Sequence, residues 1–271
     1  MRLQLVWMAV LALTLGPHAS AQTTGEATES GGLSEYEKKV FINEGDSLPY
    51  RLLKPENEVQ GKKYPLVIFL HGSGERGNDN KIQLSFGGKM WMNPVNREKH
   101  PTYVLFPQCP RDSFGVFSID ASKPFNHDEF MRHPKFSKVG MNLKALIESY
   151  IANPQIDSKR IYIMGTSMGS MSTFDMAIRF PELFTAVVPI CGSLTGDRLK
   201  SLQGKDIKFR IFHGDADPIA PVTDARAAYR KLLELGVDVE YFEYPGVDHG
   251  CWYKACIEPT FVDWIFNQRK N

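Results

Sequence analysis

A serine between two glycines, Ser167 in the sequence Gly-Thr-Ser-Met-Gly at residues 165–169, has the setting of a nucleophile. Residues 161–164 before it are β-branched or apolar and predict a buried strand, and apolar residues after it recur at helical spacing until Pro181. At such a strand-to-helix turn the serine holds a strained backbone conformation, and the glycines avoid clashes with the neighbouring strand and helix. The pattern predicts an exposed hydroxyl positioned to attack a carbonyl carbon.

A serine hydroxyl needs a base to take its proton, and the base needs an orienting acid. Asp217 follows an apolar run at 208–212, and His249 follows another at 239–243. Because parallel strands end at one edge of a sheet, we expect both side chains on the same edge as Ser167. We therefore assign Asp217 as the acid and His249 as the base.

Nearby polar residues leave alternatives open. Asp215 is two residues from Asp217, and spacing alone does not exclude it as the acid. Asp248 adjoins the base and is expected to point elsewhere. His213, at the start of its turn, is expected to fix the loop by hydrogen bonding, and His71 is interpreted in the same way.

A developing negative charge on the carbonyl oxygen needs two N–H donors. The Met168 amide, at the start of the predicted helix, is the first, since helix N-termini receive anions. A glycine-rich loop follows the apolar run 66–70, and we choose the Ser73 amide as the second donor, although the loop alone would also fit an ordinary turn. Glu75 and Arg76 in this loop are expected to form a structural ion pair.

Apolar strand-length runs alternate with amphipathic helical patterns along the chain. This alternation predicts an α/β fold, with a mostly parallel central sheet covered by helices on both faces, and no second domain or large cap domain. Residues 38–53 predict an N-terminal antiparallel hairpin with its turn at 43–46. The predicted strands are 66–70, 103–106, 161–164, 184–190, 208–212 and 239–243, and the predicted helices include 139–151, 222–235 and 259–266.

Residues 107–138 show no clear periodicity, and a long segment of this kind is usually functional or disordered. Its aromatic side chains, including Phe114 and Phe117, either contact substrate or anchor the segment to the core; Phe125 is a third. Trp252, three residues past the base, either lines the pocket or packs under it. His127, Asp128, Glu129 and His133 match no standard metal site, so no metal or other cofactor is expected.

The 271 residues, 42% hydrophobic with a net charge of +1, fit one globular domain and disfavour nucleic acid as a partner. Residues 1–21 resemble a secretory signal peptide with cleavage after Ala21, and their apolar run is too short to span a membrane. We expect a flexible leader at 22–35, a catalytic domain at 36–271, and a secreted or periplasmic bacterial location. The monomeric or homodimeric state is left open.

Export would permit disulfides, and the chain has four cysteines. Cys109 and Cys191 are interpreted as small buried hydrophobic side chains. Cys251 and Cys256 are close enough to pair, although their spacing does not require it.

Several longer stretches carry a resemblance to a known family. The chain resembles secreted bacterial α/β-hydrolase esterases related to feruloyl and acetyl-xylan esterases, whose relatives are often labelled predicted peptidases or dienelactone-hydrolase-like proteins. This resemblance implies an α/β-hydrolase fold, a triad of Ser167, Asp217 and His249, and an oxyanion hole formed by Met168 and the residue after His71-Gly72. The matching stretches are 70–80 (LHGSGERGNDN), 106–110 (FPQCP), 160–169 (RIYIMGTSMG), 180–192 (FPELFTAVVPICG), 213–221 (HGDADPIAP) and 244–252 (YPGVDHGCW).

The leading hypothesis is a serine esterase that releases feruloyl or acetyl groups from plant polysaccharides or from small-molecule esters. A peptidase with the same triad is the alternative. A non-catalytic binding module on the same fold is a third hypothesis, which the intact Ser, Asp and His disfavour.

Overall fold

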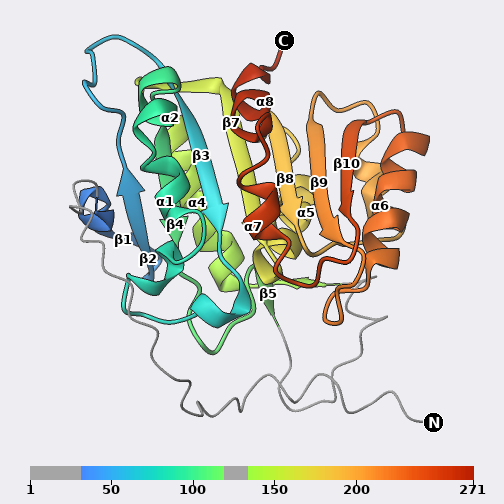
Figure 1. The fold of residues 1–271 in the computed structure, drawn as a ribbon. Coiled ribbons are helices and arrows are strands. Elements are labelled where there is room, and N and C mark those ends of the chain that lie inside the picture. The colour runs from blue at the N-terminus through green and yellow to red at the C-terminus, as the bar shows by residue number, and fades with distance from the viewer. Residues whose placement is uncertain (1–31, 119–133) are drawn as a thin grey trace, which may run out of the picture. The chain divides into compact units, whose positions relative to one another are not determined.

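Eight strands form one sheet: in spatial order they are β1 (Glu37–Asn43), β2 (Asp46–Leu53), β4 (Tyr103–Pro107), β3 (Tyr64–Leu70), β7 (Ile156–Thr166), β8 (Ala186–Ile190), β9 (Lys208–Gly214) and β10 (Asp238–Tyr244) (Figure 1). The computed structural model describes residues 32–118 and 134–271. Strands β4, β3, β7, β8, β9 and β10 pair in parallel. Strand β2 pairs antiparallel with both β1 and β4. The predicted parallel sheet and N-terminal hairpin are confirmed.

Helices cover both faces of the sheet because its central strands are apolar on both sides. Along β3, for example, Leu66 and Ile68 face one core cluster and Val67 and Phe69 face the other. We call the side of the sheet that packs in the first cluster the first face; its cluster includes residues of α4 (Lys138–Ile151), α5 (Met168–Arg179) and α6 (Val222–Glu234). The second face includes residues of α1 (Gly88–Trp91), α7 (Trp252–Ala255) and α8 (Phe261–Asn267).

Short elements complete the fold. Helix α2 (Pro94–Lys99) starts at an Asn93 cap, whose side chain accepts the amides of the first turn. Strands β5 (Phe117–Ser118) and β6 (Lys135–Phe136) form a separate antiparallel pair. The remaining elements are the 3-10 helices η2 (Leu33–Glu35), η3 (Ser73–Glu75), η4 (Ile82–Leu84) and η5 (Asp197–Leu202).

Some predictions differ from the structure or lie outside it. Residues 33–35, expected within the flexible leader, form η2, and Glu35 pairs with the buried Arg97. The strand before the elbow is longer than predicted, since β7 spans Ile156–Thr166. The predicted signal peptide lies outside the described residues. Among the described helices, none is long and apolar enough to cross a membrane.

Candidate active site

Ser167 lies at the turn between β7 and α5, as the sequence predicts. Its φ of 54° and ψ of −116° put a non-glycine residue in a sparsely populated region of backbone conformation. The Ser167 amide donates to the carbonyl of Ile190 in β8 at 2.9 Å. The strain therefore persists because the turn is tied to the neighbouring strand.

Glycines permit this turn because backbone from two other segments packs against it. A methyl group on Gly165 would lie 2.6 Å from the Gly169 carbonyl, and one on Gly169 would overlap the carbonyl oxygen of Leu70. Gly192, after β8, is a third glycine of this kind, since its methyl group would lie 2.7 Å from the Ser167 carbonyl oxygen. The first two follow from the elbow pattern, whereas Gly192 had no signal in the sequence.

The structure brings Ser167, His249 and Asp217 together in one hydrogen-bonded chain. The Nε2 atom of His249 is 2.8 Å from the Ser167 hydroxyl, and its Nδ1 atom is 2.7 Å from Oδ2 of Asp217. Asp217 follows β9 and His249 follows β10, so the parallel strands deliver all three side chains to one edge of the sheet. The arrangement is that of a nucleophile, a base and an orienting acid.

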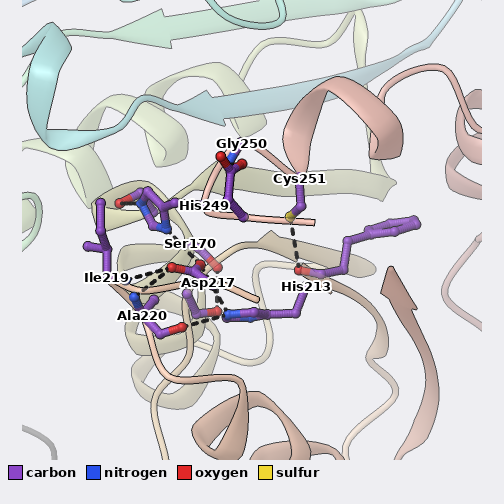
Figure 2. Close-up of polar contacts among 12 residues, drawn as sticks. Ser170, His213, Asp217, Ile219, Ala220, His249, Gly250 and Cys251 are labelled. Carbon is purple, nitrogen blue, oxygen red and sulfur yellow. Dashed lines mark hydrogen bonds and ion pairs between the residues drawn. The ribbon is translucent and has the colours of Figure 1, made fainter. Parts of the chain in front are cut away.

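The Asp217 side chain has no exposed surface and accepts hydrogen bonds on both carboxylate oxygens (Figure 2). Its Oδ1 accepts the amides of Ile219 and Ala220 at 2.8 and 2.9 Å, and its Oδ2 lies 3.3 Å from Nε2 of His213. Burial alone would raise the pKa of Asp217, but the hydrogen bonds from His213, His249 and Ala220 outweigh it and hold the pKa well below its ordinary value. The ionised carboxylate accepts the Nδ1 proton of His249, which leaves Nε2 free to accept the serine proton.

The alternative acids point elsewhere. Oδ1 of Asp215 accepts the amide of Gly246 at 2.6 Å, and Oδ1 of Asp248 accepts the amide of Gly250 at 2.8 Å. His213 fixes its loop as expected, because its Nε2 atom is 3.0 Å from the Ala220 carbonyl. Sequence reasoning missed its second contact, with Asp217.

The glycine-rich loop after β3 lies directly against the nucleophile. A methyl group on Gly72 would meet the Ser167 Cβ atom at 3.7 Å, and Ser73 begins η3. His71 is buried and holds this loop: its Nε2 atom accepts the Cys109 amide at 2.9 Å, so its Nδ1–H donates to the Gly72 carbonyl at 2.6 Å. Burial lowers the pKa of His71 to about 4, so the ring stays neutral in this role at neutral pH.

Glu75 and Arg76 do not form the expected ion pair. The Arg76 guanidinium donates instead to the carbonyls of Ser73, Arg111 and Ser113. The Glu75 carboxylate oxygen Oε2 lies 3.1 Å from the position of a methyl group on Gly72. Burial raises the pKa of Glu75, against hydrogen bonds from backbone amides of the loop.

Trp252, one of the three suggested substrate contacts, packs against the triad. Its ring centroid is 5.7 Å from that of His249, in an edge-on arrangement. Phe117 has no exposed surface and packs in the core, and Phe114 packs against the same core cluster with the Arg76 guanidinium 6.0 Å from its ring. Both phenylalanines therefore fit the loop-anchor interpretation better than the substrate-contact one. Phe125, His127, Asp128, Glu129 and His133 lie outside the described residues.

An apolar pocket lies beside the elbow, on the first face of the sheet. Met168, Gly169 and Ser172 of α5 form one wall, and Leu143 of α4 and Cys109 lie among the other lining residues. Within residues 32–118 and 134–271 no group of three or more His, Cys, Asp or Glu side chains is arranged to hold a metal ion.

All four cysteines are free thiols in the structure, so Cys251 and Cys256 do not pair. Cys109 and Cys191 are buried, as expected. Burial and the neighbouring Cys251 thiol raise the pKa of Cys191 well above its ordinary value. Cys109, Cys191 and Cys251 act as buried apolar groups, and Cys256 is partly buried.

Several known proteins with a similar sequence or structure are described as hydrolases. A crystal structure described as a thermostable esterase is 35% identical, with a TM-score of 0.77 over 88% of this chain and 64% of that one. Poly(3-hydroxyalkanoate) depolymerase C of Paucimonas lemoignei is 27% identical over 47% of this chain, which spans only 28% of that protein's length. The probable carboxylesterase SOBER1-like of Arabidopsis thaliana is 24% identical over 77% of this chain and 80% of its own.

The phospholipase/carboxylesterase family model matches residues 57–257, a range that contains the elbow, the glycine-rich loop and both partners of Ser167. The family match, the parallel sheet and the serine at its edge therefore agree with one another. The chain therefore belongs to the phospholipase/carboxylesterase family and has the α/β-hydrolase fold.

Proposed function

We propose that the protein is a secreted serine esterase in which Ser167, His249 and Asp217 hydrolyse carboxylic esters. The single observation that supports this most is the continuous chain of hydrogen bonds from the Ser167 hydroxyl through His249 to the buried Asp217. A serine hydroxyl in contact with an oriented, neutral imidazole is the activated nucleophile that acyl transfer requires.

In the first half-reaction, the Ser167 oxygen attacks the carbonyl carbon of the ester while Nε2 of His249 takes the hydroxyl proton. The resulting oxyanion accepts hydrogen bonds from the amides of Met168 and Ser73. His249 then gives the proton to the alcohol oxygen, which leaves, and the acyl group stays on Ser167. Asp217 stabilises the imidazolium throughout.

In the second half-reaction, water attacks the acyl-enzyme and His249 takes a proton from that water. The tetrahedral species breaks down with return of the proton to the Ser167 oxygen, and the carboxylic acid leaves. The apolar pocket beside Met168 and Gly169 is the space in which we expect the acyl group to bind.

The proposed substrates are feruloyl or acetyl esters of plant polysaccharides. The predicted signal peptide at residues 1–21 supports this, since polymers of this kind stay outside the cell. We take the segment after residue 21 and before η2 as the link between this peptide and the catalytic domain.

A panel of esters tests the proposal. Acetyl, butyryl and feruloyl esters are compared on small alcohols and on xylan, together with peptide p-nitroanilides for the alternative peptidase activity. We expect turnover of esters, loss of turnover in Ser167→Ala, and labelling of Ser167 by a fluorophosphonate. Turnover of the anilides alone, or no labelling of folded protein, would overturn the proposal.

A further inference from the structure

Three aromatic rings, those of Phe86, Trp252 and Tyr253, form a cluster beside His249, which we call the aromatic cluster. The Phe86 ring is 5.0 Å from Trp252 and 5.9 Å from Tyr253, and the last two rings are 5.6 Å apart. Trp252 also contacts the His249 imidazole at 5.7 Å. Phe86 precedes α1, whereas the other two residues begin α7, so the cluster joins two distant segments next to the base.

The aromatic cluster and the apolar pocket lie on opposite faces of the sheet. Trp252 packs against the second face, together with α1, α7 and α8. The pocket residues Leu70 and Leu143 belong to the core of the first face. Ser167, at the end of the central strand β7, lies between the two, so an ester bound there has one apolar region on each side.

Proton transfer decides which half of the ester meets which region. His249 gives its proton to the alcohol oxygen, so the alcohol half must lie next to His249 when the ester bond breaks. The aromatic cluster is the apolar surface in contact with His249. The pocket is lined instead by Met168 and Gly169, at the amide that receives the carbonyl oxygen, which is the acyl side.

The exposed part of the aromatic cluster has the chemistry of a sugar-binding surface. Tyr253 is 64% exposed, and its ring lies 5.6 Å from that of Trp252, which contacts His249. A methyl group on Gly250 would lie 3.7 Å from the Tyr253 ring and 3.1 Å from Oδ1 of Asp248, so the ring and this carboxylate both lie next to Gly250. Oδ1 of Asp248 accepts a hydrogen bond from the Gly250 amide, and Oδ2 of Asp248 makes no hydrogen bond to any residue that the structure describes.

We propose that the aromatic cluster is the subsite for the sugar ring whose hydroxyl oxygen carries the ester, and that Oδ2 of Asp248 accepts a hydrogen bond from a neighbouring hydroxyl of that sugar. The apolar C–H face of a sugar packs on aromatic rings, and its hydroxyl groups need acceptors at the edge. This inference rests on the proposed esterase function and adds that the enzyme selects the alcohol half of its substrate.

The test compares two acetate esters that differ only in the alcohol, acetylated xylotriose and ethyl acetate. In Tyr253→Ala we expect the ratio of their kcat/KM values to fall about tenfold, because only the sugar loses a packing surface. Tyr253→Phe keeps the ring and should lose less. Ile257→Ala, which removes a side chain that is 78% exposed just beyond α7, is the matched control and should leave the ratio unchanged.

A binding measurement separates this inference from the esterase proposal. In a Ser167→Ala background, calorimetry should give a Kd for xylotriose that Tyr253→Ala weakens about tenfold. Sugar binding of this kind without any ester turnover would support the subsite and overturn the esterase function. An unchanged kcat/KM ratio and an unchanged Kd in Tyr253→Ala would overturn the subsite, while ethyl acetate turnover would leave the esterase function intact.

Discussion

Replacing Asp217 by Asn should abolish most of the activity without disturbing the fold. Oδ1 accepts two backbone amides, those of Ile219 and Ala220, so the asparagine carbonyl oxygen must stay on that side. Its NH₂ group then faces Nδ1 of His249 and Nε2 of His213. His249 must adopt the tautomer whose Nδ1 atom accepts, which puts a proton on Nε2 and removes the base from Ser167.

The expected magnitude is large because no other acid replaces Asp217. A triad held in the wrong tautomer loses about four orders of magnitude in kcat, which is about 5.5 kcal/mol of transition-state stabilisation. The assay is kcat for p-nitrophenyl acetate, with thermal unfolding of each variant to verify the fold. KM should change little, because the lost interaction belongs to the transition state.

Asp215→Asn is the matched control, two residues away in the same loop. Its carboxylate accepts the Gly246 amide and makes no contact with His249, so we expect less than about a threefold change in kcat. The reasoning is refuted if Asp215→Asn loses more activity than Asp217→Asn, or if folded Asp217→Asn stays within about tenfold of the parent.

Three further predictions concern packing, pH and charge. In Gly169→Ala the added methyl group would overlap the carbonyl oxygen of Leu70, so urea denaturation should show a free energy of unfolding lower by about 3 kcal/mol or more. In the control Gly74→Ala no atom lies within 4 Å of the methyl position, so the free energy of unfolding should change little. Equal effects of the two substitutions would contradict the packing at the elbow. Burial lowers the pKa of His71 from 6.5 to about 4, so the unfolded chain binds a proton that the folded chain does not, and stability should fall by about 3 kcal/mol as the pH drops through that window. The His71→Gln side chain does not titrate, so between pH 7 and pH 4 this variant should lose about 3 kcal/mol less stability than the parent. A pH dependence of stability equal to that of the parent would exclude His71 as the cause. The Glu75 carboxylate and the Ser167 Cβ atom both border the methyl position of Gly72, so the carboxylate should repel an anionic substrate by about 1 kcal/mol. Glu75→Gln should therefore raise kcat/KM for monoethyl succinate relative to diethyl succinate by about fivefold, and a constant ratio would place the carboxylate too far away to act.

The sequence was most informative where chemistry restricts the residue type. The elbow needs glycines at 165 and 169 because backbone packs against them, and this requirement is visible in the residues themselves. The apolar strands were equally clear, since buried parallel strands are continuous runs of apolar residues. The preference for Asp217 over Asp215 agrees with the hydrogen bonds, although spacing alone left both open.

Features made by distant segments had no signal of their own. Helices α1 and α7 have four residues each, too few for a periodic pattern, yet they bring Phe86 and Trp252 together. Phe117 was a candidate substrate contact because an aperiodic segment reveals nothing about burial, and the structure buries it in the core. The pocket on the first face combines residues of several elements and could not be derived from any one of them.

The division of the core by the sheet has a consequence for how substrate preference can change. The pocket residue Leu143 belongs to the core cluster of the first face, whereas Trp252 packs against that of the second face, with the strands between them. Substitutions at sites without shared partners add in free energy. The effects of Leu143→Phe and Tyr253→Ala on substrate preference should therefore add. A descendant of this chain could change its specificity for the acyl group without changing its specificity for the alcohol, or the reverse.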